Sequence, residues 1–265
     1  MLRGGPLAQT CREQIQPVNG ERKGTRAINS PQHELTTISR SIIQNASRTR
    51  EAVPVGPFTA LIHPVDAAPW FNYAAVAEPG ADAPALRAAL ADLRGLFRQR
   101  QRRLRFEYVE ALSPVLADIL EEQGLCLESR CQLMLCLPDW LQYSPAPDVH
   151  CRLLVPDDPA LPAALEAQRA AFGMEPFTSP AEELARVRAE IAEGAQQMGV
   201  AEIAGQAAAG ACLMAAGGVA ELAGVGTHPD FRRRGAALSL AGSLTGSFFQ
   251  QGGRIRRRHV LAEHQ

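Results

Sequence analysis

The chain has 265 residues, of which 46% are hydrophobic and 21% charged, the balance of an ordinary soluble protein with one large or two small domains. Its formal net charge of −1 excludes a chain that binds nucleic acid through overall positive charge. No apolar run is long enough to span a membrane, and Gly4-Gly5-Pro6 interrupts any signal-like segment, so we expect a cytoplasmic protein without a membrane partner.

The first half of the chain predicts an extension followed by a folded unit. Residues 1–50 are polar and weakly periodic, so we expect a mobile N-terminal extension, although Ile38, Ile42 and Ile43 would suit a short helix. Apolar periodicity then predicts an α/β unit over residues 56–140. Its expected strands are residues 58–63, 71–76, 104–109 and 125–137, and its expected helices are residues 82–100 and 113–124.

The second half predicts a longer unit over residues 151–265, after a Pro-containing linker at 141–150. Its expected strands are residues 151–155, 200–203, 207–214, 219–225 and about 260–262, and its expected helices are residues 161–172, 181–193 and 236–251. Gly205-Gln206 and Gly217-Gly218 predict hairpin turns. Arg254 and Arg256–Arg258 are expected to precede the buried part of the last strand, residues 259–262.

The cysteines predict buried structural thiols rather than a metal site. Their spacings match no zinc pattern, and half of them lie in the apolar stretch 125–137. We therefore expect no metal. The six are Cys11, Cys126, Cys131, Cys136, Cys151 and Cys212.

A basic, glycine-bearing turn between the strand at 219–225 and the helix at 236–251 predicts a phosphate site. Backbone N–H groups at a helix N-terminus lack intrahelical partners, and the helix dipole favours an anion there. Gly235 has no Cβ, so the backbone can approach a ligand closely. Arg232, Arg233 and Arg234 add guanidinium donors. The alternative is an Arg-rich loop that caps an ordinary helix, because nearly all basic residues of this chain are arginine.

The pattern Arg232-x-x-Gly235-x-Ala237 resembles the Gln/Arg-x-x-Gly-x-Gly/Ala loop of the GNAT (Gcn5-related N-acetyltransferase) superfamily. The resemblance covers residues 151–265 and implies an α/β (α+β) fold, the acyl-CoA N-acyltransferase-like mixed sheet flanked by helices. It also implies that the loop cradles the pyrophosphate of acetyl-CoA, the co-substrate. The residues that it assigns to acetyl-CoA are Ala223, Val225, Thr227, Phe231, Arg232, Arg233, Arg234, Gly235, Ala236 and Ala237.

The unit at 56–140 is similar to the later part of the same fold, and we interpret it as a degenerate second GNAT-like copy. Where the loop would fall, residues 78–82 read Glu-Pro-Gly-Ala-Asp, an acidic turn that repels a pyrophosphate. The alternative is an unrelated α/β module.

Two residues are candidates for the catalytic base that the family resemblance implies. Glu221 lies on the strand where the family often carries a carboxylate, and apolar neighbours favour a carboxyl that works as a base near neutral pH. The alternative is that Glu221 points outward. His228 is the second choice, since it also suits a turn before Pro229. The resemblance further implies that backbone groups of residues 223–225 contact pantetheine and that an N–H near Val225 or Thr227 polarises the thioester.

The family pattern continues with a helix and two strands past the point where this sequence ends, and that helix carries a tyrosine that acts as general acid. Here the tyrosines are Tyr73, Tyr108 and Tyr143, all before residue 151. We expect a truncated end, strands supplied from elsewhere, or a non-catalytic remnant, and therefore weak or absent activity.

The sequence leaves three functions to compare. The first is an N-acetyltransferase that transfers acetyl from acetyl-CoA to an amine of a small molecule or peptide by direct attack in a ternary complex. The second is a non-catalytic acyl-CoA-binding or regulatory module. The third, nucleic-acid binding through the arginines at 98–105, is disfavoured because aromatic residues are not interleaved with them. The acceptor is expected to contact residues near 172–179.

Overall fold

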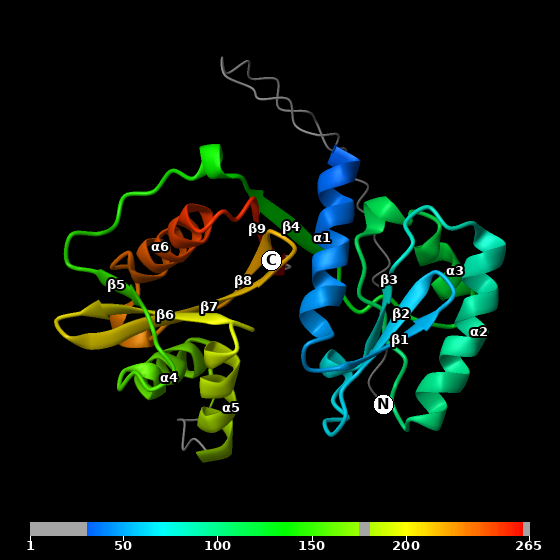
Figure 1. Cartoon of the computed structure of the whole chain (residues 1–265), viewed down its shortest axis with the longest axis horizontal. Coiled ribbons are helices and arrows are strands. Elements are labelled where there is room, and N and C mark those ends of the chain that lie inside the picture. Colours follow the sequence, from blue (N-terminus) through cyan, green and yellow to red (C-terminus); the bar gives the residue numbers. More distant parts are fainter. Residues whose placement is uncertain (1–30, 175–180, 262–265) are drawn as a thin grey trace, which may run out of the picture.

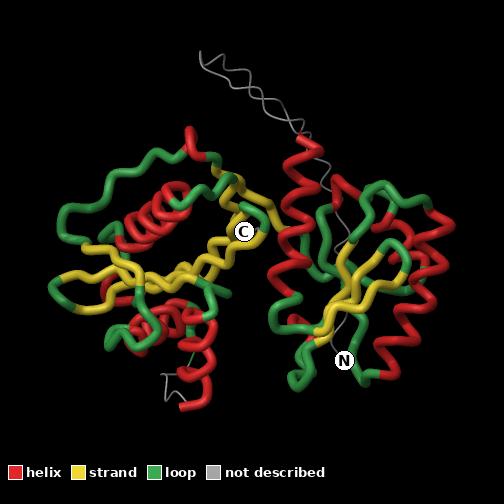
Figure 2. Tube along the Cα trace, viewed as in Figure 1, coloured by secondary structure: helices red, strands yellow, loops and turns green. Residues whose placement is uncertain are grey.

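The computed structural model describes residues 31–174 and 181–261 (Figure 1). Residues 1–30 of the predicted extension lie outside this range. Within it, the strands form two sheets, and helix α1 lies between them (Figure 2). None of the described helices has the length and apolar character needed to cross a membrane.

The first sheet is antiparallel, in the order β1-β2-β3, and it is covered by two helices. Its elements are β1 (Glu51–Val55), β2 (Phe58–Ile62), β3 (Tyr73–Val76), α2 (Ala83–Gln99) and α3 (Leu116–Glu122). Asp82 caps α2 by accepting a hydrogen bond from the Ala85 N–H. Leu86, Leu90, Leu93 and Phe97 form the buried stripe of α2 and pack with Phe58 of β2, as the helical periodicity predicts.

The strand predicted at residues 104–109 is reduced to one bridge. Phe106 lies beside Ala74 of β3 in parallel orientation, and the Ala74 N–H donates to the Arg105 carbonyl at 2.8 Å. The Glu107 N–H donates in turn to the Ala74 carbonyl at 3.0 Å. The segment therefore runs alongside β3 but pairs over too short a distance to continue the sheet.

Helix α1 (Pro31–Ala46) corrects the expectation of a mobile extension for residues 31–50. Ile38 and Ile42 are buried against Val219 and Ile255 of the second sheet. The Ser39 hydroxyl donates to the Val76 carbonyl at 3.2 Å, and the Asn45 amide donates to the Met214 carbonyl at 3.0 Å. The few apolar residues of α1 are enough to stabilise the helix, because they are buried between the two halves of the molecule.

The second sheet has the order β4-β9-β8-β7-β6-β5. Its strands are β4 (Cys131–Cys136), β5 (His150–Leu153), β6 (Gln197–Ile203), β7 (Gln206–Ala216), β8 (Val219–Thr227) and β9 (Ile255–Leu261). The helices α4 (Leu161–Ala171) and α5 (Ala181–Ala192) pack on one face, and α6 (Ala236–Gln250) packs on the other (Figure 1). This mixed α+β arrangement confirms the predicted fold class.

Strand β4 joins the two halves. Residues 131–136 belong to the stretch predicted as the end of the first unit, yet they pair antiparallel with β9, from Cys131 opposite Leu261 to Cys136 opposite Arg256. Leu133, Leu135 and Leu137 pack with α1 and β9, and this apolar contact explains why β4 joins the second sheet and not the first. The first unit thus contributes its last strand to the second sheet, where that strand lies beside β9.

The predicted linker at 141–150 is docked along α6. The Tyr143 ring lies against Gly242, and the Ala146 N–H donates to the Ser239 hydroxyl at 2.9 Å. The Ala146 methyl lies next to Gly235, where an added Cβ would approach it to 2.9 Å. The small residues of α6 therefore form the surface on which the linker packs.

This packing predicts opposite effects for two glycine substitutions on α6. Gly246→Ala should raise the free energy of unfolding by about 0.5–1 kcal/mol, because alanine is the better helix former and the new Cβ makes ordinary contacts. Gly242→Ala should lower it by about 1–2 kcal/mol, because its Cβ overlaps the Tyr143 ring. Urea unfolding followed by circular dichroism measures both, and equal stabilisation would show that Tyr143 does not pack there.

Candidate functional site

The Arg-Gly turn lies between β8 and α6, as predicted. It follows a 3-10 turn at Pro229–Phe231, and Gly235 at the N-cap of α6 has φ +81°. Arg233 has φ +63°, unusual for a residue with a side chain. A positive φ at Arg233 costs conformational energy, and together with that at Gly235 it bends the backbone sharply before α6.

The three arginines of the turn have different surroundings, although all are exposed. Arg232 donates to the Ala171 carbonyl at the end of α4, at 3.2 Å. The Arg234 guanidinium lies 5.8 Å from the centroid of the Phe231 ring. Beside them, the open N-terminus of α6 adds backbone N–H groups and the positive end of its dipole. The turn is therefore suited to an anion.

Strands β8 and β9 separate next to this turn. They pair in parallel only over Val219–Glu221 and Ile255–Arg257. Beyond that point β9 continues against β4, while β8 continues against β7. Residues 222–227 of β8 consequently present a backbone edge that β9 does not occupy. This edge holds Ala223, Val225 and Thr227, the positions that the sequence resemblance assigned to acetyl-CoA.

A β-bulge shapes that edge. The register between β7 and β8 shifts between Gly210 and Cys212, and Gly224 opposite the shift has φ +58°. The Gln168 side chain of α4 donates to the Gly224 carbonyl at 2.6 Å. Gln168 was not among the sequence candidates, although a lone amide on the inner face of an Ala-rich helix is a usable signal. The bulge and its Gln168 contact fix the direction of the strand edge.

Glu221 lies where β8 and β9 begin to separate, and it forms an ion pair there. The Arg257 guanidinium donates to Glu221 Oε2 at 2.6 Å. Arg257 is only 2% exposed, while the Glu221 side chain is 20% exposed. The prediction that the arginines at 254–258 precede the buried part of the strand is wrong for Arg257. A buried guanidinium needs a counter-ion, and Glu221 supplies one from the neighbouring strand.

The first half of the chain approaches this ion pair through Tyr73 of β3. Burial raises the pKa of Tyr73 to about 12, and the charges of Glu107, Arg50, Glu221 and Arg257 also act on it. The Arg50 guanidinium lies 5.6 Å from the Tyr73 ring centroid. The tyrosine is therefore a neutral hydroxyl at physiological pH, within electrostatic range of the ion pair.

His228, the second candidate base, caps the turn instead of meeting Glu221. Its Nδ1 accepts a hydrogen bond from the Asp230 N–H at 3.3 Å, and its ring centroid lies 6.0 Å from that of Phe231. These contacts favour a structural role for the imidazole.

Several other sequence candidates have ordinary surroundings. Arg100 pairs with Glu51, and Arg102 donates to the His63 carbonyl at 3.3 Å, so these arginines make contacts within the first half of the chain. Phe172 is exposed, whereas residues 175–180 of the expected acceptor region lie outside the described range. Within residues 31–174 and 181–261, no three His, Cys, Asp or Glu side chains gather as a metal site would require.

Comparison with known proteins adds structural relatives. No protein-family model and no curated protein matches the sequence. A GCN5-related N-acetyltransferase from Kribbella flavida is 27% identical, with 85% of each chain covered and a TM-score of 0.67. A GCN5-related N-acetyltransferase from Sphaerobacter thermophilus (19% identity, 88% of this chain and 85% of that one, TM-score 0.56) shares the fold. A tandem GNAT protein from the clavulanic acid biosynthesis pathway does too (14% identity, 88% of both chains, TM-score 0.53).

The mixed sheet, the separating strands and the turn before α6 define an acyltransferase fold. The chain belongs to the GCN5-related N-acetyltransferase superfamily.

Proposed function

We propose that the protein transfers an acetyl group from acetyl-CoA to an amine of a small molecule or peptide, by direct attack in a ternary complex. The observation that carries this proposal is the turn Arg232-x-x-Gly235-x-Ala237. It places a left-handed glycine and the N-terminus of α6 beside the free edge of β8. A turn suited to an anion, at the end of a strand edge that β9 does not occupy, suits a ligand with a pyrophosphate and an extended amide-bearing arm.

Each part of this site would hold a different part of acetyl-CoA. Backbone N–H groups from Gly235 to Ala237, helped by the charges of Arg233 and Arg234, would bind the pyrophosphate. The β8 edge over residues 223–227 would bind the pantetheine amides as a neighbouring strand does. An N–H near Val225 or Thr227 would donate to the thioester oxygen and stabilise the negative charge that develops on it.

Glu221 is the proton acceptor in this proposal. Its ion pair with Arg257 holds the carboxylate in a fixed position. The hydrogen bond from Arg257 uses Oε2, and a carboxylate has further lone pairs with which it can take the amine proton, directly or through a water molecule. Proton removal leaves the amine lone pair free to attack the thioester carbon, and the thiolate leaves as the acetyl–nitrogen bond forms.

The same ion pair favours a second function, a non-catalytic acyl-CoA-binding module. The buried Arg257 guanidinium already occupies Oε2 of this carboxylate, which leaves fewer lone pairs to accept an amine proton. Under this alternative the turn binds the coenzyme and Glu221 serves only to neutralise Arg257.

Titration calorimetry with acetyl-CoA tests the coenzyme site. Ala237→Glu places a carboxylate at the proposed pyrophosphate position and should weaken binding by at least about tenfold, or about 1.4 kcal/mol. Acidic residues suit the first turn of a helix, so folding should be retained. Leu238→Glu is the matched control, because Leu238 is 62% exposed on the same turn. Equal affinity for both variants would contradict the proposed site.

A glycine variant is a poorer test of the same site. Any side chain at Gly235 meets the Ala146 methyl and must adopt φ +81°. A loss of binding in Gly235→Glu would therefore mix coenzyme repulsion with displacement of the linker.

An assay of coenzyme thiol release, run with acetyl-CoA and a panel of amines, distinguishes the acetyltransferase from the non-catalytic binding module. Amine-dependent thiol release supports the acetyltransferase. Tight acetyl-CoA binding without release for any amine supports the binding module.

A further inference from the structure

A cavity of about 520 Å³ lies in the first half of the molecule, away from the turn and the β8 edge. Its walls are residues 103–110 on one side and residues 124–131 on the other. Residues of α3, Arg94 of α2, Ile42 of α1 and Leu133 of β4 complete the lining. The volume is typical of a small-molecule site. None of the residues assigned to the proposed coenzyme site lines it.

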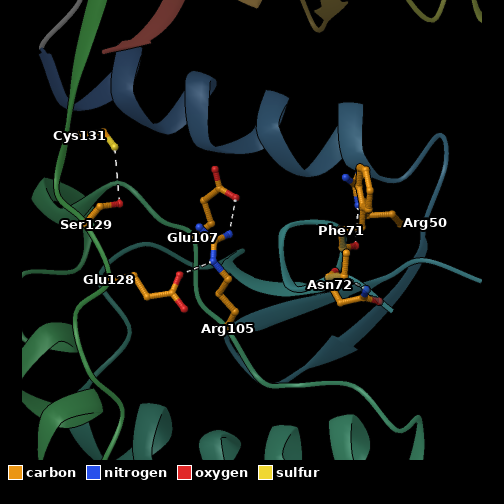
Figure 3. Close-up of polar contacts among 9 residues, drawn as sticks. Arg50, Phe71, Asn72, Arg105, Glu107, Glu128, Ser129 and Cys131 are labelled. Atoms are coloured by element: carbon orange, nitrogen blue, oxygen red, sulfur yellow. Dashed lines mark hydrogen bonds and ion pairs between the residues drawn. The ribbon is translucent and has the colours of Figure 1, made fainter. Parts of the chain in front are cut away.

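The cavity exists because β4 leaves this half of the molecule. Residues 125–130 are irregular and lead directly into β4, whose partner is β9 of the other sheet. Ion pairs hold the two walls together instead of a strand ladder. Arg105 Nε donates to Glu128 at 2.8 Å, and Arg130 binds Glu110 through two bonds of 2.9 Å. Figure 3 shows Arg105 between Glu107 and Glu128 below helix α1.

Opposite charges are balanced in this cavity. Among the described lining residues there are four arginines and four glutamates, namely Arg94, Arg103, Arg105, Arg130, Glu107, Glu110, Glu121 and Glu128. The Arg105 side chain is the most enclosed of those in the ion pairs across the walls, at 24% exposure. A ligand with a net charge would leave an unmatched charge in a partly desolvated space, whereas a ligand with one charge of each sign would not.

An apolar surface adjoins the charges. Leu104, Phe106, Leu120 and Leu125 line the same cavity and belong to or pack against the core of the first half. The cavity therefore offers a cation, an anion and an apolar wall within one small volume.

We propose that this cavity binds a small zwitterion with an apolar side chain, such as an α-amino acid or a short peptide. The ligand carboxylate takes the place of Glu128 on the Arg105 guanidinium, and the ligand ammonium takes the place of Arg105 on Glu128 or Glu107. Each displaced charge receives a new partner, so no buried charge is left unmatched. The site is independent of the proposed acetyl transfer and would exist in a binding module as well.

Calorimetric titration of the full chain with L-leucine and with L-leucyl-L-leucine tests the ligand class. At least one should bind with a dissociation constant below about 10 mM. N-acetyl-L-leucine lacks the ammonium and L-leucinamide lacks the carboxylate, so both should bind at least about tenfold more weakly than L-leucine. Absence of binding by either zwitterion to the folded chain, or equal binding of the three leucine derivatives, overturns the proposal.

Two variants test the residues. Arg105→Gln and Glu128→Gln should each weaken zwitterion binding at least about tenfold. Arg87→Gln is the matched control, because the Arg87–Glu122 pair lies on neighbouring helices and does not line the cavity. Glu128 lies in the irregular segment, so its variant should fold even where Arg105→Gln does not. Unchanged affinity in a folded Glu128→Gln variant contradicts the assigned contacts.

Cysteine labelling places the ligand in this cavity. Cys126 and Cys131 line it and are exposed, so the prediction of buried thiols is wrong for these two. Burial raises the pKa of Cys151 to about 11 and that of Cys212 to about 12, so iodoacetamide at pH 8 should label the first two faster. Saturating zwitterion should slow labelling of Cys126 and Cys131 at least about threefold by excluding the reagent. Binding that leaves both labelling rates unchanged would place the ligand elsewhere and overturn the proposal.

Discussion

Replacement of Arg257 by methionine is expected to lower the free energy of unfolding by about 3–5 kcal/mol, because it leaves the carboxylate of Glu221 without its buried partner. The loss should exceed that of any exposed ion pair in the molecule, since water screens and replaces those contacts. Guanidinium chloride unfolding followed by circular dichroism measures the change.

The double variant Arg257→Met/Glu221→Met is the control for this prediction. Two apolar side chains of similar volume remove the unmatched charge, so the double variant should recover most of the lost stability. Arg87→Met, which breaks an exposed pair, should change stability by no more than about 1 kcal/mol. If the double variant were no more stable than Arg257→Met, the loss would come from packing and not from the unpaired charge.

Glu221→Gln is expected to lower kcat about a hundredfold or more, because the amide keeps the size of the side chain but cannot accept the amine proton. The variant should be less stable because Arg257 loses this carboxylate, but in its folded state the affinity for acetyl-CoA should stay within about twofold, since the proposed pyrophosphate turn lies further along the chain. Steady-state thiol release with the best amine, together with calorimetric titration of acetyl-CoA, gives both quantities.

His228→Gln supplies the comparison for that experiment. The glutamine can still accept a hydrogen bond near the Asp230 N–H, so kcat should fall by no more than about threefold. A large loss in His228→Gln together with normal turnover in Glu221→Gln would reverse the two assignments.

The parts of the molecule that could be predicted from sequence are those with local chemical signals. Gly217 and Gly218 form the two-residue turn between β7 and β8, with φ of +60° and +80°, as their dipeptide indicates. The turn before α6 was located by Gly235 and its arginines. The other hairpin turn is Ala204-Gly205, one residue earlier than predicted, because Ala204 adopts a positive φ that its side chain disfavours.

The parts that could not be predicted depend on contacts between distant segments. The apolar alternation in β4 fits either sheet equally well, and only α1 and β9 decide between them. Likewise, nothing near Glu221 in the sequence indicates that Arg257 is its partner, because arginine is common throughout this chain. Helix α1 has too few apolar residues to be stable alone, so its formation depends on the two surfaces that it separates.

The pairing of β4 with β9 also bears on how the protein is made. Residues 137–254 lie between the two strands, so a ribosome that adds about 5–20 residues per second needs on the order of ten seconds to supply the partner of β4. During that interval the apolar face of β4 has no sheet to join, and chaperones or neighbouring nascent chains can bind it. Arg257 is made after Glu221 and the rest of β8, so the proposed proton acceptor gains its ion-pair partner only when β9 emerges.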